Sequence, residues 1–213
     1  KPAVSVITNI MRDHLNWHGS MTRYISAKSV IFAFQNSNDV LFANDSDATV
    51  KKISNRAKSR VIFPHLPAGL KPLVDRNLGI HYRASTALAV GVARHFGAAL
   101  SLIKSVLAVT CGLPGRQEII AVMQGVTVVN DTTATIPDAA IAAITRFGSR
   151  IKHNHLILIA GGSDKNLLFA DMAQVIKKYV YCLILLPGTA TEKLTKRLIT
   201  KNRRDKLPII HYA

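Results

Sequence analysis

The second half of this chain alternates short apolar segments with helical patterns, and this alternation constrains the fold more than any other feature. Strands that alternate with helices pair in parallel, and the helices cover the sheet. We therefore expect an α/β fold with a parallel sheet in this half. The predicted strands are residues 122–130, 155–160, 182–186 and 207–211, and the predicted helices are residues 137–147, 169–179 and 189–200.

The first half has a less regular pattern. Its predicted strands are residues 3–10 and 39–45, and its predicted helices are residues 21–34 and 86–96. Residues 45–79 contain three prolines and little periodicity, which predicts short strands and loops. Glycine and proline then interrupt the pattern in "TCGLPGRQE", residues 110–118. We therefore expect two domains, residues 1–110 and residues 111–213.

The composition excludes several classes of protein. Hydrophobic residues make up 48% of the 213 positions and charged residues 19%, which favours folded cores. The longest apolar run, residues 179–187, is shorter than the roughly 20 residues of a membrane helix, so no membrane association is expected. Cys111 and Cys182 lie far apart without metal-ligand spacing, which favours a reducing compartment.

The net charge of +16 would attract polyanions non-specifically. The charge is spread along the chain, and no aromatic-rich RNA-binding pattern accompanies it. Its densest cluster, residues 196–206, is typical of a solvated helix end and loop. We therefore do not expect nucleic acid to be the partner.

The stretch "VVNDTTATIPDAAIAAI", residues 128–144, brings polar side chains to the end of a predicted strand. Asn130, Asp131 and the threonines up to Thr135 precede Pro137, which suits the first turn of a helix. Polar groups between a strand and a helix N-terminus form ligand sites in α/β proteins. The alternative is an Asx turn and a threonine cap that serve only the helix.

Three further motifs place polar residues after predicted strands or turns. "VITNIMRDHLNWHGSMTRYISAK", residues 6–28, contains His14 and Lys28. "GLPGRQE", residues 112–118, contains Arg116, and "LIAGGSDKN", residues 158–166, contains Lys165 after two glycines. Taken singly, each has a structural alternative: a turn cap at His14, a solvated lysine at position 28 or 165, and an ion pair between Arg116 and Glu118.

Together these motifs, in this order, resemble the Mur ligase family, and most closely its members that add D-glutamate to UDP-N-acetylmuramoyl-L-alanine in bacterial peptidoglycan synthesis. The resemblance implies the remainder of a P-loop-type ATPase central domain followed by a Rossmann-like C-terminal domain. It also implies a monomeric enzyme of the bacterial cytoplasm with ATP and Mg²⁺ as cofactors. ATP would activate the carboxylate as an acyl phosphate, which the amine of D-glutamate would attack.

The resemblance also implies roles for individual residues. His14 matches a magnesium ligand, and Lys28 matches a lysine whose carbamylation supplies the oxygen atoms that Mg²⁺ prefers. Arg116 matches an arginine that reaches the nucleotide phosphates when the domains close. His14, Lys28 and Arg116 are therefore the predicted catalytic residues.

The remaining implied roles concern nucleotide and amino-acid binding. Asp131 matches an aspartate that contacts the ATP ribose, and its neighbour Asn130 is assigned to the same nucleotide site. Thr135 and Lys165 match residues that bind D-glutamate.

The sequence departs from the family at several points. No G-x-x-x-x-G-K-[ST] motif occurs, and the UDP-binding domain would precede Lys1. Thr133 stands where many members carry lysine, and Tyr82 and Ser85 replace asparagines found near the adenine. We therefore expect an internal portion of a ligase, or a truncated gene product, that has no turnover alone. Two alternatives remain: a degenerate module that binds polyanions, and a Mur ligase specific for another amino acid.

Overall fold

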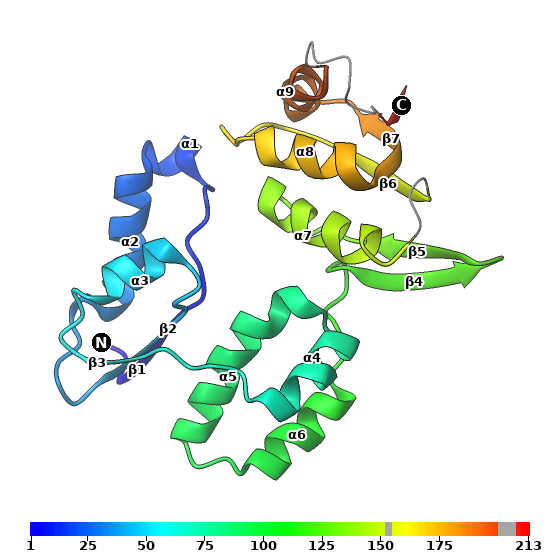
Figure 1. Cartoon of the computed structure of the whole chain (residues 1–213). Coiled ribbons are helices and arrows are strands. Elements are labelled where there is room, and N and C mark those ends of the chain that lie inside the picture. Colours follow the sequence, from blue (N-terminus) through cyan, green and yellow to red (C-terminus); the bar gives the residue numbers. More distant parts are fainter. Residues whose placement is uncertain (152–154, 200–207) are drawn as a thin grey trace. The chain divides into compact units, whose positions relative to one another are not determined.

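The computed structural model describes residues 1–151, 155–199 and 208–213 (Figure 1). The chain forms two compact units, and each is described separately below. The first unit comprises Lys1–Met11 and His18–Gly112, and the second comprises Arg12–Trp17 and Leu113–Ala213. Both units contain a parallel sheet with helices, which confirms the predicted α/β class.

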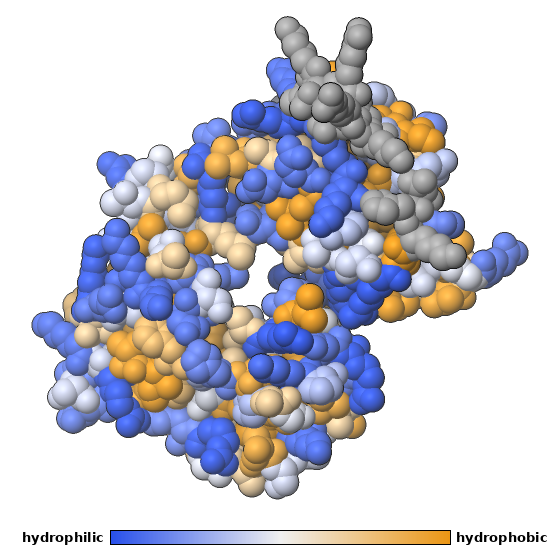
Figure 2. Space-filling model, in the orientation of Figure 1, coloured by the Kyte–Doolittle hydropathy of each residue, from blue (hydrophilic) through white to orange (hydrophobic). Residues whose placement is uncertain are grey.

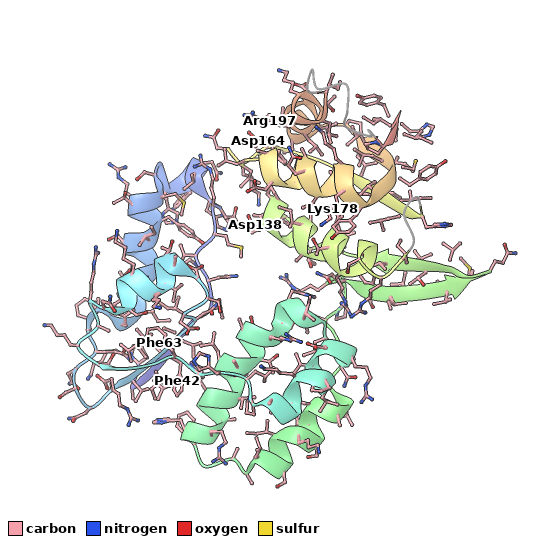
Figure 3. All side chains as sticks on the ribbon, viewed as in Figure 1. Phe42, Phe63, Asp138, Asp164, Lys178 and Arg197 are labelled. Carbon is pink, nitrogen blue, oxygen red and sulfur yellow. The ribbon has the colours of Figure 1, made fainter. Side chains whose placement is uncertain are left out.

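The first unit is built on a three-stranded parallel sheet. Its strands are β1 (Val4–Ile7), β2 (Val40–Ala43) and β3 (Arg60–Ile62), with β2 in the centre. All four residues of β2 are buried, and Phe42, labelled in Figure 3, is only 1% exposed. A continuous apolar run is what a parallel strand covered on both faces requires. The strands predicted at residues 3–10 and 39–45 are confirmed with shorter bounds.

The predicted helices of the first half are also present. They correspond to α2 (Met21–Ala33) and α5 (Arg83–His95). The loops and short strands predicted for residues 45–79 were partly wrong, because the helices α3 (Ala48–Ser54) and α4 (Lys71–Asn77) also form there. The Asp47 side chain accepts a hydrogen bond from the Val50 N–H at 2.9 Å and so caps the start of α3. The other elements of this half are α1 (Leu15–His18), α3 (Ala48–Ser54), α4 (Lys71–Asn77) and α6 (Leu100–Val109), with 3₁₀ turns at Ala68–Leu70 and Ile80–Tyr82.

The second unit contains another parallel sheet, in which β7 (Val180–Leu186) lies between β6 (Leu156–Gly161) and β8 (Ile209–Tyr212). The helices α7 (Pro137–Gly148) and α8 (Ala170–Tyr179) pack side by side, and α8 also contacts α9 (Thr189–Leu198) (Figure 1). Its core consists of buried side chains, mostly from the helices and from β7, and includes Ile144, Ala173, Ile176, Leu183, Leu185, Leu194 and Leu198.

The predicted alternation of the second half is therefore confirmed for β6, α8, β7 and α9. The ends of two predicted elements, residue 200 of the last helix and residue 207 of the last strand, lie outside the described residues, as does most of the basic cluster at 196–206. Among the described residues, no helix has both the length and the apolar character needed to cross a bilayer.

The single strand predicted at residues 122–130 was wrong. The chain instead forms an antiparallel hairpin from β4 (Glu118–Met123) and β5 (Val126–Asn130). Gln124 and Gly125 have φ values of +50° and +79°, and two successive positive φ angles are the mark of a two-residue hairpin turn. Apolar side chains stay exposed on the hairpin, including Val122 at 66%, and Figure 2 shows this apolar surface beside the polar tip.

Candidate functional site

Hydrogen bonds join the loop before β4 to the loop after β5. The Thr133 N–H and hydroxyl both donate to the Gly115 carbonyl, at 3.1 Å and 2.7 Å. The Gln117 N–H donates to Asp131 Oδ1 at 3.0 Å. The sequence placed Arg116 and Asp131 in separate motifs, and the structure brings those two motifs together.

Arg116 is presented by an unusual backbone. Its neighbours Gly115 and Gln117 are buried and have φ values of +69° and +51°, whereas Arg116 itself is exposed. A Cβ on Gly115 would lie 3.1 Å from Cγ2 of Thr133, so glycine suits both the backbone angle and the close approach of Thr133. The guanidinium therefore sits at the surface of a loop that is anchored on both sides.

Burial raises the pKa of Asp131 above its ordinary value of 3.8, although the Gln117 N–H and the positive charge of Arg116 oppose the shift. A carboxyl with a raised pKa in the folded state costs folding free energy when it ionises. That cost is absent below the ordinary pKa and is fully present above the raised pKa. A partly desolvated carboxylate beside a cation is typical of a functional site.

Asn130 and Glu118 reinforce the same loops. Asn130 Oδ1 accepts from the Thr132 N–H at 3.2 Å and from its hydroxyl at 2.9 Å, which is the Asx turn considered from the sequence. Glu118 Oε2 accepts from the Gly115 N–H at 2.8 Å and from Asn130 Nδ2 at 3.4 Å. Asn130 therefore has a structural task in addition to the nucleotide contact predicted for it.

We expect Thr133→Val to lower the free energy of unfolding by about 1 kcal/mol, because the variant keeps the side-chain shape but loses the hydroxyl bond to Gly115. Thr127→Val, at an exposed position of β5, is the matched control and should change stability little. Urea denaturation of both variants measures the difference. Equal stability of the two variants would show that the Thr133 hydroxyl does not hold the loops together.

The two predicted D-glutamate contacts also belong to the second unit. Thr135 is exposed two residues before α7 begins at Pro137. Lys165 has a side chain that is 37% exposed, with Nζ 4.0 Å from Asp13 Oδ1. Both side chains are thus accessible to a ligand.

The loop before Lys165 is held by Asp164. Its N–H donates to Thr189 Oγ1 at 2.9 Å, and its Oδ1 accepts from the Leu167 N–H at 3.0 Å. Burial tends to raise the pKa of Asp164, but hydrogen bonds, chiefly from Lys193 on α9, outweigh burial and lower it. The Asp164 carboxylate therefore stays charged and fixes the loop against α9.

His14 and Lys28 fall in different units. His14 has a φ of +54°, its N–H donates to Asp13 Oδ1 at 2.8 Å, and its Nε2 lies 3.2 Å from Asp13 Oδ2. Lys28 is exposed on α2, with Nζ 5.4 Å from the centre of the Tyr24 ring.

These side chains do not form a magnesium site by themselves. Within residues 1–151, 155–199 and 208–213, no three side chains of His, Cys, Asp or Glu gather closely enough to hold a metal ion. Unmodified Lys28 is a cation, and His14 offers only an imidazole, whereas Mg²⁺ prefers oxygen ligands. Magnesium binding by His14 and Lys28 therefore stays a prediction that depends on carbamylation of Lys28, and no step below passes through the ion.

Sequence reasoning missed two residues of the site, Gln117 and Arg146. Arg146 is 9% exposed on α7, and its Nη1 donates to Gln117 Oε1 at 3.2 Å. In the sequence, Arg146 looks like any cation near a helix C-terminus. What distinguishes the pair is the burial of both residues and the hydrogen bond between them, which depend on the fold and leave no mark in the sequence.

Models of known protein families match both halves of the chain. Residues 1–89 match the Mur ligase middle domain, and residues 115–210 match the Mur ligase glutamate ligase domain. The chain belongs to the Mur ligase family. A curated relative from Symbiobacterium thermophilum, named UDP-N-acetylmuramoylalanine–D-glutamate ligase, is 32% identical over 214 residues, which cover 89% of this chain and 46% of the relative. This Mur ligase chain thus spans about half the length of the curated relatives it matches.

Solved structures share the fold of this Mur ligase chain. MurF from Acinetobacter baumannii superposes with a TM-score of 0.66 at 16% identity, covering 100% of this chain and 56% of that one. Mycobacterium tuberculosis folylpolyglutamate synthase, solved with ADP, gives a TM-score of 0.67 at 17% identity over 99% of this chain and 53% of that one. At these identities the similarity establishes the fold alone.

Proposed function

We propose that this chain is part of an ATP-dependent amide ligase that joins D-glutamate to UDP-N-acetylmuramoyl-L-alanine. The observation that carries the proposal is the hydrogen bond from the Gln117 N–H to Asp131, which brings the Arg116 loop and the Asp131 loop into one site. The relative's printed name supports the choice of substrates. The synthase solved with ADP supports a nucleotide as ligand of this fold.

Each side chain has a defined task in this proposal. The Asp131 carboxylate accepts hydrogen bonds from both ribose hydroxyls, since a carboxylate can take two donors at once. The Arg116 guanidinium offsets negative charge on the phosphate oxygens during phosphoryl transfer. An oxygen of the muramoyl-alanine carboxylate attacks the γ-phosphorus, and ADP leaves.

The second step forms the amide. The Lys165 ammonium attracts a carboxylate of D-glutamate, and the Thr135 hydroxyl donates a hydrogen bond to the same substrate. The amine nitrogen then attacks the acyl carbon, inorganic phosphate leaves, and the nitrogen loses a proton. Holding the amine beside the acyl phosphate supplies most of the rate gain in such a reaction.

The wider setting is part of the same proposal. Residues 1–110 would belong to the central ATPase domain and residues 111–213 to the C-terminal domain of a monomeric enzyme in the bacterial cytoplasm. ATP and Mg²⁺ would be its cofactors, with His14 and a carbamylated Lys28 as metal ligands once further oxygen ligands join them. Asn130 would contact the nucleotide beside Asp131.

Lys165→Ala tests the substrate assignment. We expect the Kd for D-glutamate, measured by calorimetry with ADP present, to rise by about tenfold or more, because a hydrogen bond to a charged group is lost. Lys178→Ala is the matched control: it removes an equal charge from an exposed position of α8 (Figure 3) and should leave the Kd within about twofold. An equal effect of both changes would indicate non-specific attraction to the basic surface.

Two other functions would give different binding results. A Mur ligase with another specificity would bind ADP but respond to a different amino acid. A polyanion-binding module would bind nucleic acid with an affinity that falls steeply with salt and would not respond to ADP or D-glutamate.

A further inference from the structure

We propose that Arg146 is a positioning residue of the nucleotide site, acting through Gln117 to hold Asp131 and Arg116 in their binding arrangement. The proposal rests on the function proposed above and adds to it a residue outside the matched motifs. Neither Arg146 nor the Gln117 side chain is assigned to the ligand itself.

The first step concerns the Gln117 side chain. Gln117 is 8% exposed, and its Oε1 accepts from Arg146 Nη1 at 3.2 Å. Arg146 lies in the last turn of α7, where the helix dipole favours a cation, and its guanidinium lies 5.0 Å from the centre of the Phe147 ring. The Gln117 acceptor thus bonds to a donor on α7, a helix that packs against α8.

The second step concerns the Gln117 backbone. A φ of +51° is uncommon for a residue with a side chain, so the surrounding structure must select it. This conformation allows the Gln117 N–H to donate to Asp131 Oδ1 at 3.0 Å. The hydrogen bond from Arg146 holds the end of the Gln117 side chain and so favours this backbone conformation.

The third step links this anchor, the hydrogen bond between Arg146 and Gln117, to the ligand contacts. Gln117 directly follows exposed Arg116, and its N–H bond fixes one oxygen of Asp131. With this oxygen fixed, the carboxylate is oriented before the nucleotide arrives, which reduces the entropy lost on binding. Loss of the anchor should therefore weaken nucleotide binding although Arg146 does not touch the nucleotide.

A double-mutant cycle tests the proposal. Arg146→Met removes the donor, and Gln117→Gly removes the side chain while making the positive φ easy to adopt. We expect Arg146→Met to raise the Kd for ADP about fivefold in the unaltered chain and less than about twofold in the Gln117→Gly background. If Arg146→Met acted only by destabilising α7, it would raise the Kd for ADP by the same factor in both backgrounds. Equal fold-changes would therefore overturn the proposal.

Nuclear magnetic resonance provides a readout that needs no nucleotide. The amide proton of residue 117 should report the ionisation of Asp131 in the unaltered chain, because it donates to that carboxylate. Its pH-dependent shift should shrink in Arg146→Met and be largely retained in Arg146→Lys, which keeps a donor cation. An unchanged shift in Arg146→Met would refute the positioning role. If the shift shrinks but the unaltered chain does not bind ADP, the positioning role stands and the proposed function fails.

Discussion

Asp131→Asn should weaken ADP binding by roughly tenfold to a hundredfold while the fold survives. Asparagine keeps an oxygen that can accept from the Gln117 N–H, but it loses the charge and the second ribose acceptor. Because burial raises the pKa of Asp131, its ionisation costs folding free energy at neutral pH. Asp131→Asn should therefore be as stable as the unaltered chain at pH 7, or more stable. Calorimetry and urea denaturation at pH 7 measure the two quantities.

Asp138→Asn is the control for this prediction, because it removes the same charge from an exposed position in the first turn of α7 (Figure 3). It should leave the ADP affinity unchanged and lose only a small helix-dipole contribution. Any stability gained by Asp131→Asn should vanish below about pH 3.8, where the aspartate is protonated in both the folded and the unfolded chain. An undiminished ADP affinity in Asp131→Asn would remove Asp131 from the site.

The largest loss of stability is expected from Gly188→Ala, at roughly 3 kcal/mol or more. Gly188 precedes α9 with a φ of +147°, a conformation reserved for glycine, and an added Cβ would overlap the Gly162 carbonyl. That carbonyl accepts from the Ala190 N–H at 2.9 Å, so the clash would separate α9 from the loop that carries Lys165. Thermal unfolding measures the effect.

Substitutions at two other glycines distinguish the cost of the backbone angle from the cost of the clash. Gly162→Ala meets an unfavourable φ of +123° but open space, so it should cost about 1–3 kcal/mol. Gly69→Ala meets neither a positive φ nor a close neighbour and should be nearly neutral. If Gly188→Ala proved as stable as Gly69→Ala, the described approach of Gly188 to the Gly162 carbonyl would be wrong.

The sequence predicted the parallel sheets well because buried strands and amphipathic helices leave clear periodic patterns. The continuous apolar run of β2 and the alternation from β6 to α9 follow directly from burial. The hairpin was missed, although "QG" at Gln124 and Gly125, between two apolar stretches, is a usable turn signal. The helix α3 was missed because it is short and its Asp47 cap lies in a segment of weak periodicity.

The candidate site was predicted in part. The motifs supplied Arg116 and Asp131, and the structure shows that the loops carrying them are bonded together. The bonding of Thr133 to Gly115 could not be predicted, because it depends on a tertiary approach between two loops. Gln117 and Arg146 were missed for the same reason: 29 positions separate them in the sequence, and only the fold brings the two side chains together.

The central claim is that the joined loops around Arg116 and Asp131 bind the nucleotide. Titration of the isotope-labelled chain with ADP, followed by amide chemical shifts, tests it most directly. We predict saturable shifts centred on residues 115–117 and 130–133. They should persist at about 0.3 M salt, because salt screens exposed charges more than partly buried ones. Shifts centred instead on the basic turns of α9 that disappear with salt, or no shifts in the two loops, would contradict the account.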